Sequence, residues 1–286
     1  MLSYRHGFHA GNFADVLKHL VQVEILTYLQ KKDKPLDYID THAGAGLYRL
    51  QDDMAARNCE YGNGISRLLS EGSGLPALEP CLEALRPYLN SVLAHNAGGR
   101  LQVYPGSPAI ACGLLRPQDR AWLFELHPAD VEQLRRACAG RNIHIRGEDG
   151  FRGLAALLPT PSRRALVLID PPYELKEDYQ RVVDALKLIY RKMPTATVAL
   201  WYPVVERGRI DQLEHQVVVS GIRRVEQFEL GIRADTDGRG MTASGMIVVN
   251  PPWTLRDKMA ELLPPLAKLL SEDGGAHQSI QTLVGE

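Results

Sequence analysis

The segment that most constrains the fold of this chain is residues 166–173, in which four apolar residues lead directly into Asp170, Pro171, Pro172 and Tyr173. Consecutive apolar residues without alternation are typical of a strand that is buried on both faces of a parallel sheet. Neither proline can donate a backbone hydrogen bond, so the pair ends the strand in a stiff turn. Open α/β sheets bind ligands at the carboxyl ends of their strands. An acid, two fixed carbonyls and an aromatic ring meet there, and a planar ring that carries an amino group could use all three.

Strands and helices alternate along most of the 286 residues, which predicts an α/β fold with a doubly wound parallel sheet. The expected strands are residues 36–40, 101–104, 121–125, 143–146, 166–170, 197–202, 224–230 and 245–250. The expected helices are residues 14–31, 128–138, 178–191 and 205–215, with two shorter helices that end near residues 115 and 158.

The composition changes after residue 50, where apolar residues follow a helical spacing that glycines and prolines interrupt. This pattern predicts a small helical insertion rather than part of the sheet. We therefore expect one domain over residues 1–286, with an inserted helical subdomain at residues 50–98.

Composition excludes several classes of protein. The net charge of −1 argues against a globally basic nucleic-acid coat protein, although 33 lysines and arginines leave room for a local basic patch. The four cysteines (Cys59, Cys81, Cys112 and Cys138) form no C-x-x-C pair, which favours reduced thiols over a zinc site or a disulfide framework. The chain has no signal-peptide pattern at its start and no apolar run of about 18 residues. We expect a cytoplasmic protein without a metal or a membrane span.

Acids and glycines follow successive expected strands. The first strand leads into a loop that contains Gly44 and Gly46, and such loops let a backbone approach a nucleotide-like ligand closely. Glu125 ends a later strand, where an acid commonly accepts the two hydroxyls of a ribose. Asp149 could hold an adenine amino group, with Gly150 allowing its backbone N–H to approach a ring nitrogen. The alternative is that these acids are only helix N-caps.

The order of these features resembles that of class I S-adenosylmethionine-dependent methyltransferases, and Asp170-Pro171-Pro172-Tyr173 resembles the signature of their amino-directed branch. The resemblance implies a Rossmann-like sheet of seven strands, the last of them antiparallel. An amine conjugated with its ring is a poor nucleophile. Hydrogen bonds to the Asp170 carboxylate and the Pro171 carbonyl would favour a nitrogen with a free lone pair, and Tyr173 would stack on the base. Asp170 could also accept the released proton.

A second apolar run ends in Asn250, Pro251, Pro252 and Trp253 and competes with this motif. In the methyltransferase fold the last strand is antiparallel, so its carboxyl end lies at the edge of the sheet opposite the cofactor. We therefore expect this motif to be a packing and stop element, not a catalytic one.

Several further motifs narrow the resemblance to the bacterial 23S ribosomal RNA adenine-N6 methyltransferase family (RlmJ-like). They are residues 1–6, 8–12, 14–19, 40–46, 104–108, 125–128, 201–205 and 239–246. The resemblance implies S-adenosylmethionine contacts at His19, His42, Ser107, Glu125, Asp149, Gly150 and Asp170. It also implies that Tyr4 and Lys18 touch the RNA near the entrance of the site.

We expect a methyltransferase that modifies the N6 amino group of one adenine in 23S ribosomal RNA, with the base flipped onto Asp170-Pro171-Pro172-Tyr173 and S-adenosylmethionine as the methyl donor. A local patch that includes Tyr4, Arg5, His6 and Lys18 would contact the RNA, and the protein would act as a monomer. The alternatives are a DNA adenine or RNA guanine-N2 methyltransferase, a protein glutamine methyltransferase and a catalytically silent RNA-binding module. A nicotinamide dehydrogenase lacks support, since the glycine loop does not extend into a full G-x-G-x-x-G fingerprint.

Overall fold

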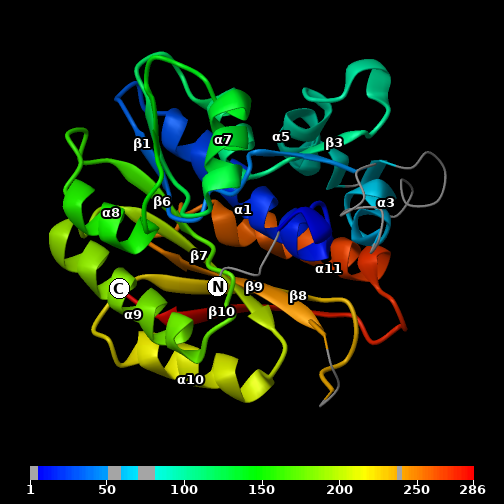
Figure 1. The fold of residues 1–286 in the computed structure, drawn as a ribbon. Coiled ribbons are helices and arrows are strands. Elements are labelled where there is room, and N and C mark those ends of the chain that lie inside the picture. The colour runs from blue at the N-terminus through cyan, green and yellow to red at the C-terminus, as the bar shows by residue number, and fades with distance from the viewer. Residues whose placement is uncertain (1–5, 51–58, 70–80, 237–239) are drawn as a thin grey trace.

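The computed structural model describes residues 6–50, 59–69, 81–236 and 240–286 (Figure 1). An eight-stranded sheet in the order β10-β8-β9-β7-β6-β1-β4-β5 forms its centre. The strands are β1 (Asp37–Asp40), β4 (Arg120–Phe124), β5 (Ile143–Arg146), β6 (Ala165–Ile169), β7 (Thr197–Val204), β8 (Val225–Gly231), β9 (Ala243–Val249) and β10 (His277–Val284). β9 runs antiparallel to both of its neighbours, and β10 runs antiparallel to β8, whereas β5, β4, β1, β6 and β7 are parallel. The predicted α/β class is confirmed.

Helices cover both faces of the sheet (Figure 1). A separate cluster of buried apolar residues lies between the sheet and the helices on each face. One face carries α1 (Phe13–Gln30), α6 (Ser107–Leu114), α7 (Pro128–Ala137) and α11 (Leu255–Leu270). The other face carries α8 (Gly150–Leu157), α9 (Lys176–Lys192) and α10 (Arg207–Val218). All five residues of β6 are buried, as expected for a strand covered on both faces. Among the described residues, no helix is long and apolar enough to cross a membrane.

The structure differs from the sequence prediction at two strands. The sheet has eight strands rather than seven, because β10 adds a strand beyond β8 at one edge. Its mixed polar sequence matches an edge strand that is only partly covered, and such a strand carries no strong apolar pattern. The strand predicted at residues 101–104 is β3 (Val103–Pro105), which leaves the main sheet and pairs with β2 (Leu47–Arg49) in a separate hairpin.

Short helices connect β2 to β3 in the region where an insertion was predicted. They are η2 (Glu60–Asn63), α3 (Ile65–Leu69), α5 (Leu82–Leu93) and η4 (Ala97–Gly99), while residues 51–58 and 70–80 lie outside the described part. α5 packs on α1, α6 and α11, and the hydroxyls of Tyr88 and Tyr104 lie 3.0 Å apart. The division into one domain with an inserted subdomain at residues 50–98 stays a prediction.

The second Pro-Pro motif lies where the antiparallel strand places it. Val249 at the end of β9 pairs with Val198 at the start of β7, so Asn250 lies at the amino edge of the parallel strands. The Asn250 side chain donates hydrogen bonds to the carbonyls of Pro194 and Ala196, at 2.7 and 2.9 Å. Asp170 follows β6 at the opposite, carboxyl edge. The two motifs are therefore separated by the length of the sheet.

Candidate active site

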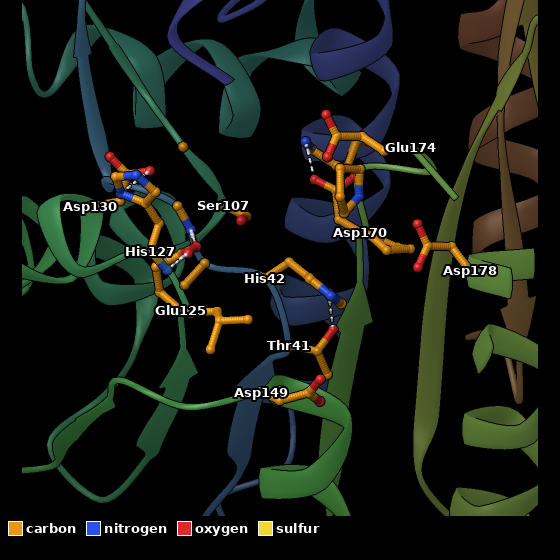
Figure 2. A pocket seen from close by; sticks show the side chains of 18 of the residues that line it. Thr41, His42, Ser107, Glu125, His127, Asp130, Asp149, Asp170, Glu174 and Asp178 are labelled. Atoms are coloured by element: carbon orange, nitrogen blue, oxygen red, sulfur yellow. Dashed lines mark hydrogen bonds and ion pairs between the residues drawn. The ribbon is translucent and has the colours of Figure 1, made fainter. Parts of the chain in front are cut away.

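A cavity at the carboxyl edge of the sheet, called the first cavity below, collects most of the predicted site residues (Figure 2). Its wall includes His19, His42, Ser107, Glu125, Asp149, Gly150, Asp170 and Pro171. Figure 2 shows Glu125 and His127 on one side, Asp170 and Glu174 on the other, and His42 between them. The side chains come from α1, from the start of α6 and from the ends of four parallel strands, which are distant in sequence. Tyr4 lies outside the described residues.

Glu125 fastens the glycine loop to the end of β4. Its two carboxylate oxygens accept the backbone N–H groups of Gly44 and His127, at 2.8 and 2.7 Å. Gly44 has a φ of 61°, and Gly46 has a φ of 83°, so both occupy the left-handed region that favours glycine. Burial raises the pKa of Glu125, against the lowering effect of these N–H groups. A carboxylate has about four lone-pair sites, so Glu125 keeps some acceptor capacity beyond its backbone hydrogen bonds.

Three residues that only the resemblance indicated also line the first cavity. The Nδ1 atom of His42 lies 2.8 Å from the hydroxyl of Thr41, and burial lowers the His42 pKa to about 4, which leaves the ring neutral at pH 7. Ser107 donates its hydroxyl to Asp40 at 2.7 Å. The Nδ1 atom of His19 lies 2.7 Å from the hydroxyl of Tyr104. The local sequence does not predict these contacts, because the partners of His19 and Ser107 are distant along the chain.

Asp149 and Gly150 have strong structural roles of their own. Asp149 is the N-cap of α8: it accepts the N–H of Arg152 at 3.1 Å, and it pairs with Arg181 at 2.5 Å. Burial alone would raise the pKa of Asp149, but these two partners hold this pKa below its usual range. A Cβ at Gly150 would overlap the backbone carbonyl of Thr41. Asp149 is thus a helix N-cap, as the alternative interpretation proposed, and Asp149 and Gly150 also line the first cavity.

We predict that Gly150→Ala destabilises the chain by about 3 kcal/mol, because an added methyl group meets immobile backbone of the loop after β1. Urea unfolding followed by circular dichroism measures this change. Gly147→Ala is the matched control, since a Cβ there would meet Val131 at an ordinary 3.7 Å. Equal stability of the two variants would contradict the close packing of Gly150 on Thr41.

Lys18 is buried between two carboxylates. Its side chain is only 4% exposed, and its ammonium lies 2.6 Å from Asp170 and 2.8 Å from Asp15. Burial alone would lower the pKa of Lys18, but the two carboxylates hold this pKa above its ordinary value. A buried ammonium with two carboxylate partners is poorly placed to bind a backbone phosphate. Lys18 therefore lies beside the acid of the Asp-Pro-Pro-Tyr motif, and its expected contact with RNA stays a prediction.

A second cavity lies on the other side of Asp170. It shares Lys18, Asp170 and Pro172 with the first cavity. Its remaining wall is partly aromatic, with Tyr173, Tyr179 and Trp201, and also includes His9, Asn12, Asp15, Arg209 and Met241. The Tyr173 hydroxyl donates to the Trp201 carbonyl at 2.7 Å, and the Tyr173 ring centroid lies 4.7 Å from that of Tyr179. Tyr173 has a φ of 51°, a strained conformation of the kind that clusters at functional sites.

Sequence reasoning missed several residues of this second cavity. Asp15 and Trp201 were assigned no role, although Asp15 pairs with Lys18 and the Lys18 ammonium lies 5.8 Å from the Trp201 ring centroid. A signal existed for Asp15: with Lys18 it forms an i, i+3 pair of opposite charges on a mostly apolar helix. Among the described residues, no cluster of three or more His, Cys, Asp or Glu is placed to hold a metal ion.

The fold and the site define the class of the protein. An antiparallel strand between two parallel ones at one side of a doubly wound sheet, with two cavities that meet at Asp170 and Pro172, is the architecture of a Rossmann-like methyltransferase. The family model described as "Ribosomal RNA large subunit methyltransferase D, RlmJ" matches residues 33–282. The chain belongs to this family of ribosomal RNA methyltransferases, and the resemblance drawn from its motifs is confirmed.

Two curated relatives support this membership, and one solved structure is similar to the chain over nearly its whole length. The curated relatives from Escherichia coli K12 and Haemophilus influenzae Rd, both named Ribosomal RNA large subunit methyltransferase J, are 49% identical over 287 residues and 46% identical over 288 residues. Each alignment covers 100% of this chain and 100% of the relative. A crystal structure of a Legionella pneumophila protein has a TM-score of 0.86 and 34% identity, and covers 96% of this chain and 98% of that chain.

Proposed function

We propose that this chain methylates the exocyclic N6 amino group of one adenine in 23S ribosomal RNA, with S-adenosylmethionine as the donor and without a metal. One observation carries the proposal: two cavities lie on either side of Asp170-Pro171-Pro172-Tyr173 and meet at Asp170 and Pro172. A donor in the first cavity and a base in the second would face each other across the acid. The relatives' names point to ribosomal RNA as the substrate.

The side chains that line the first cavity support S-adenosylmethionine as its ligand. The remaining acceptor capacity of Glu125 suits a ribose hydroxyl, and Asp149 with the Gly150 N–H suits the adenine edge. His19, His42, Ser107 and Asp170 would contact the remainder of the molecule. When bound, S-adenosylmethionine supplies an electrophilic methyl group.

The second cavity suits a flipped purine. Tyr173 and Tyr179 present aromatic faces, and stacking on such a face stabilises a base by about 1–3 kcal/mol. This offsets the few kcal/mol that unstacking a target nucleotide costs. The base enters with its amino edge toward Asp170, because this carboxylate and the Pro171 carbonyl are the acceptors of the motif.

Asp170 activates the amine by orientation and by charge. One of its oxygens, Oδ2, is held by Lys18, so the other is the acceptor for an amino N–H. This hydrogen bond and the one to the Pro171 carbonyl direct the nitrogen lone pair toward the first cavity. Lys18 holds the Asp170 carboxylate in place before transfer. Asp170 then accepts the proton that the amine loses.

A methyl-transfer assay tests the proposal. Purified protein, tritiated S-adenosylmethionine and 23S RNA from a strain that lacks this methyltransferase should yield labelled RNA, and mass spectrometry of the digested RNA should identify N6-methyladenosine. N2-methylguanosine in place of N6-methyladenosine would contradict the base assignment. Transfer to DNA or protein but not to RNA, or cofactor binding without any transfer, would overturn the proposal. Light scattering of the same sample tests the expected monomer, and fractionation of cells tests the expected cytoplasmic location.

A further inference from the structure

The Asn250-Pro251-Pro252-Trp253 turn plays no part in the proposed reaction, yet it presents the most exposed large apolar side chain among the described residues. Trp253 is 75% exposed. It lies beside a groove at the amino edge of the sheet, opposite both cavities, and Tyr28, Leu29, Pro194, Thr195 and Arg224 line this groove with the turn itself. A side chain this exposed does not contribute to the apolar core, so core packing does not explain a tryptophan at this position.

The turn that carries Trp253 is rigid. Asn250 has a φ of 50° and Arg224 a φ of 57°, and the N–H of Asn250 donates to the carbonyl of Arg224 at 2.9 Å. Thr197 donates its hydroxyl to the carbonyl of Asn250 at 3.0 Å. Left-handed residues other than glycine are strained and persist where the surroundings hold them. The indole is therefore presented on a fixed turn, which lowers the entropy that a bound partner must overcome.

Cations surround this groove. Arg224 lines it, the Lys31 ammonium lies 5.3 Å from the Tyr28 ring centroid, and Arg164 donates to the Leu29 carbonyl at 2.6 Å. Arg163 is exposed, and its carbonyl accepts the Thr195 hydroxyl at 3.4 Å. Burial and the neighbouring guanidinium of Arg116 lower the pKa of Arg164. In the described part of the chain these four cations make no ion pair with a carboxylate, although the net charge of the chain is −1. This edge of the sheet gathers four cations, with the carboxylate of Glu24 near Lys31 and that of Asp119 near Arg164.

We propose that the groove at Trp253 is a second RNA-binding site, which stacks an unpaired base of the substrate on Trp253 and binds the adjoining phosphates through Lys31, Arg163 and Arg224. The proposal rests on the proposed function, because it assumes an RNA substrate. Aromatic rings interleaved with unpaired cations suit a single-stranded nucleic acid. The core of a protein–protein interface is apolar and poor in charged residues. The single indole of Trp253 is instead surrounded by charged residues and few apolar ones, so a protein partner fits this groove less well.

The separation of the two sites makes the proposal specific. β7 spans the sheet from Thr197, beside the groove, to Val204 near the second cavity, and eight residues of strand extend about 25 Å. A short RNA that only places its target adenine in the second cavity would not reach Trp253. A longer RNA with an unpaired segment would occupy both sites.

Trp253→Ala tests this site in the full chain. For long 23S RNA fragments we expect KM and Kd to rise about tenfold or more, while kcat at saturation and the KM for a short hairpin substrate stay unchanged. Lys31→Ala and Arg224→Ala should each lower the slope of log Kd against log salt by about one. Val219→Ala is the matched control, because Val219 is another exposed apolar residue, 65% exposed, at the end of α10.

Unchanged KM and Kd for long naked RNA in Trp253→Ala, with methyl transfer intact, would overturn the second site and leave the proposed function standing. The same result accompanied by weaker binding to assembled ribosomal subunits would also overturn it, and would assign the groove to a protein partner. Absence of methyl transfer by the wild-type chain on any RNA would overturn the proposed function instead.

Discussion

Replacement of Asp170 by asparagine is expected to reduce the rate of methyl transfer about 10³-fold or more, while the chain still folds and still binds S-adenosylmethionine. The amide has nearly the shape of the carboxylate, but it cannot accept a proton, and it places either an uncharged oxygen or an NH₂ group against the Lys18 ammonium 2.6 Å away. Loss of one preorganised charged group commonly costs 10²–10³ in rate, and loss of a positioned proton acceptor costs a comparable factor.

Single-turnover kinetics with saturating RNA measure this rate without interference from product release. Calorimetric titration with S-adenosylmethionine measures whether the first cavity is intact. Asp184→Asn is the matched control, because Asp184 is an exposed acid on α9 that lines neither cavity. Retention of transfer by Asp170→Ala together with its loss in Asn250→Ala would reverse the assignment of the two Pro-Pro motifs.

The parts of the site that the sequence predicts are those with a local cause. Four apolar residues followed by two prolines specify a buried strand and its end, so the residue pattern alone places Asp170 at the carboxyl edge of the sheet. Glu125 follows from the same rule at β4. The antiparallel course of β9 then places Asn250 at the far edge, as the structure confirms.

Contacts between distant segments could not be predicted in this way. Gly150 was assigned to close approach by a ligand, but the backbone of Thr41 occupies the place of its missing Cβ. The ion pair between Lys18 and Asp170 was not predicted, because one sequence does not show that a partner 152 residues away lies beside the ammonium. β10 was missed for another reason: an edge strand that is half covered needs no continuous apolar run.

Replacement of Lys18 by methionine is expected to lower the transfer rate at least about 100-fold and to destabilise the fold by about 3–5 kcal/mol. The substitution keeps the length of the side chain but leaves the carboxylates of Asp15 and Asp170 buried without their shared cation. The pKa of Lys18 is raised in the folded chain, so its stabilising effect is complete below the ordinary pKa of lysine and is lost only as the pH rises through the higher folded value. The stability difference between wild type and variant should therefore stay constant between about pH 6 and pH 9 in urea titrations.

The double variant Lys18→Met, Asp15→Asn separates the two effects of Lys18. Removing the second carboxylate should restore much of the lost stability, since a single buried acid then faces no like charge. It should not restore the transfer rate, because Asp170 still lacks the ammonium that fixes its Oδ2 atom and leaves its other oxygen to the amine. If the double variant regained transfer along with stability, Lys18 would act as a counter-ion for folding alone, and the orientation of Asp170 would have to come from the two prolines that follow it.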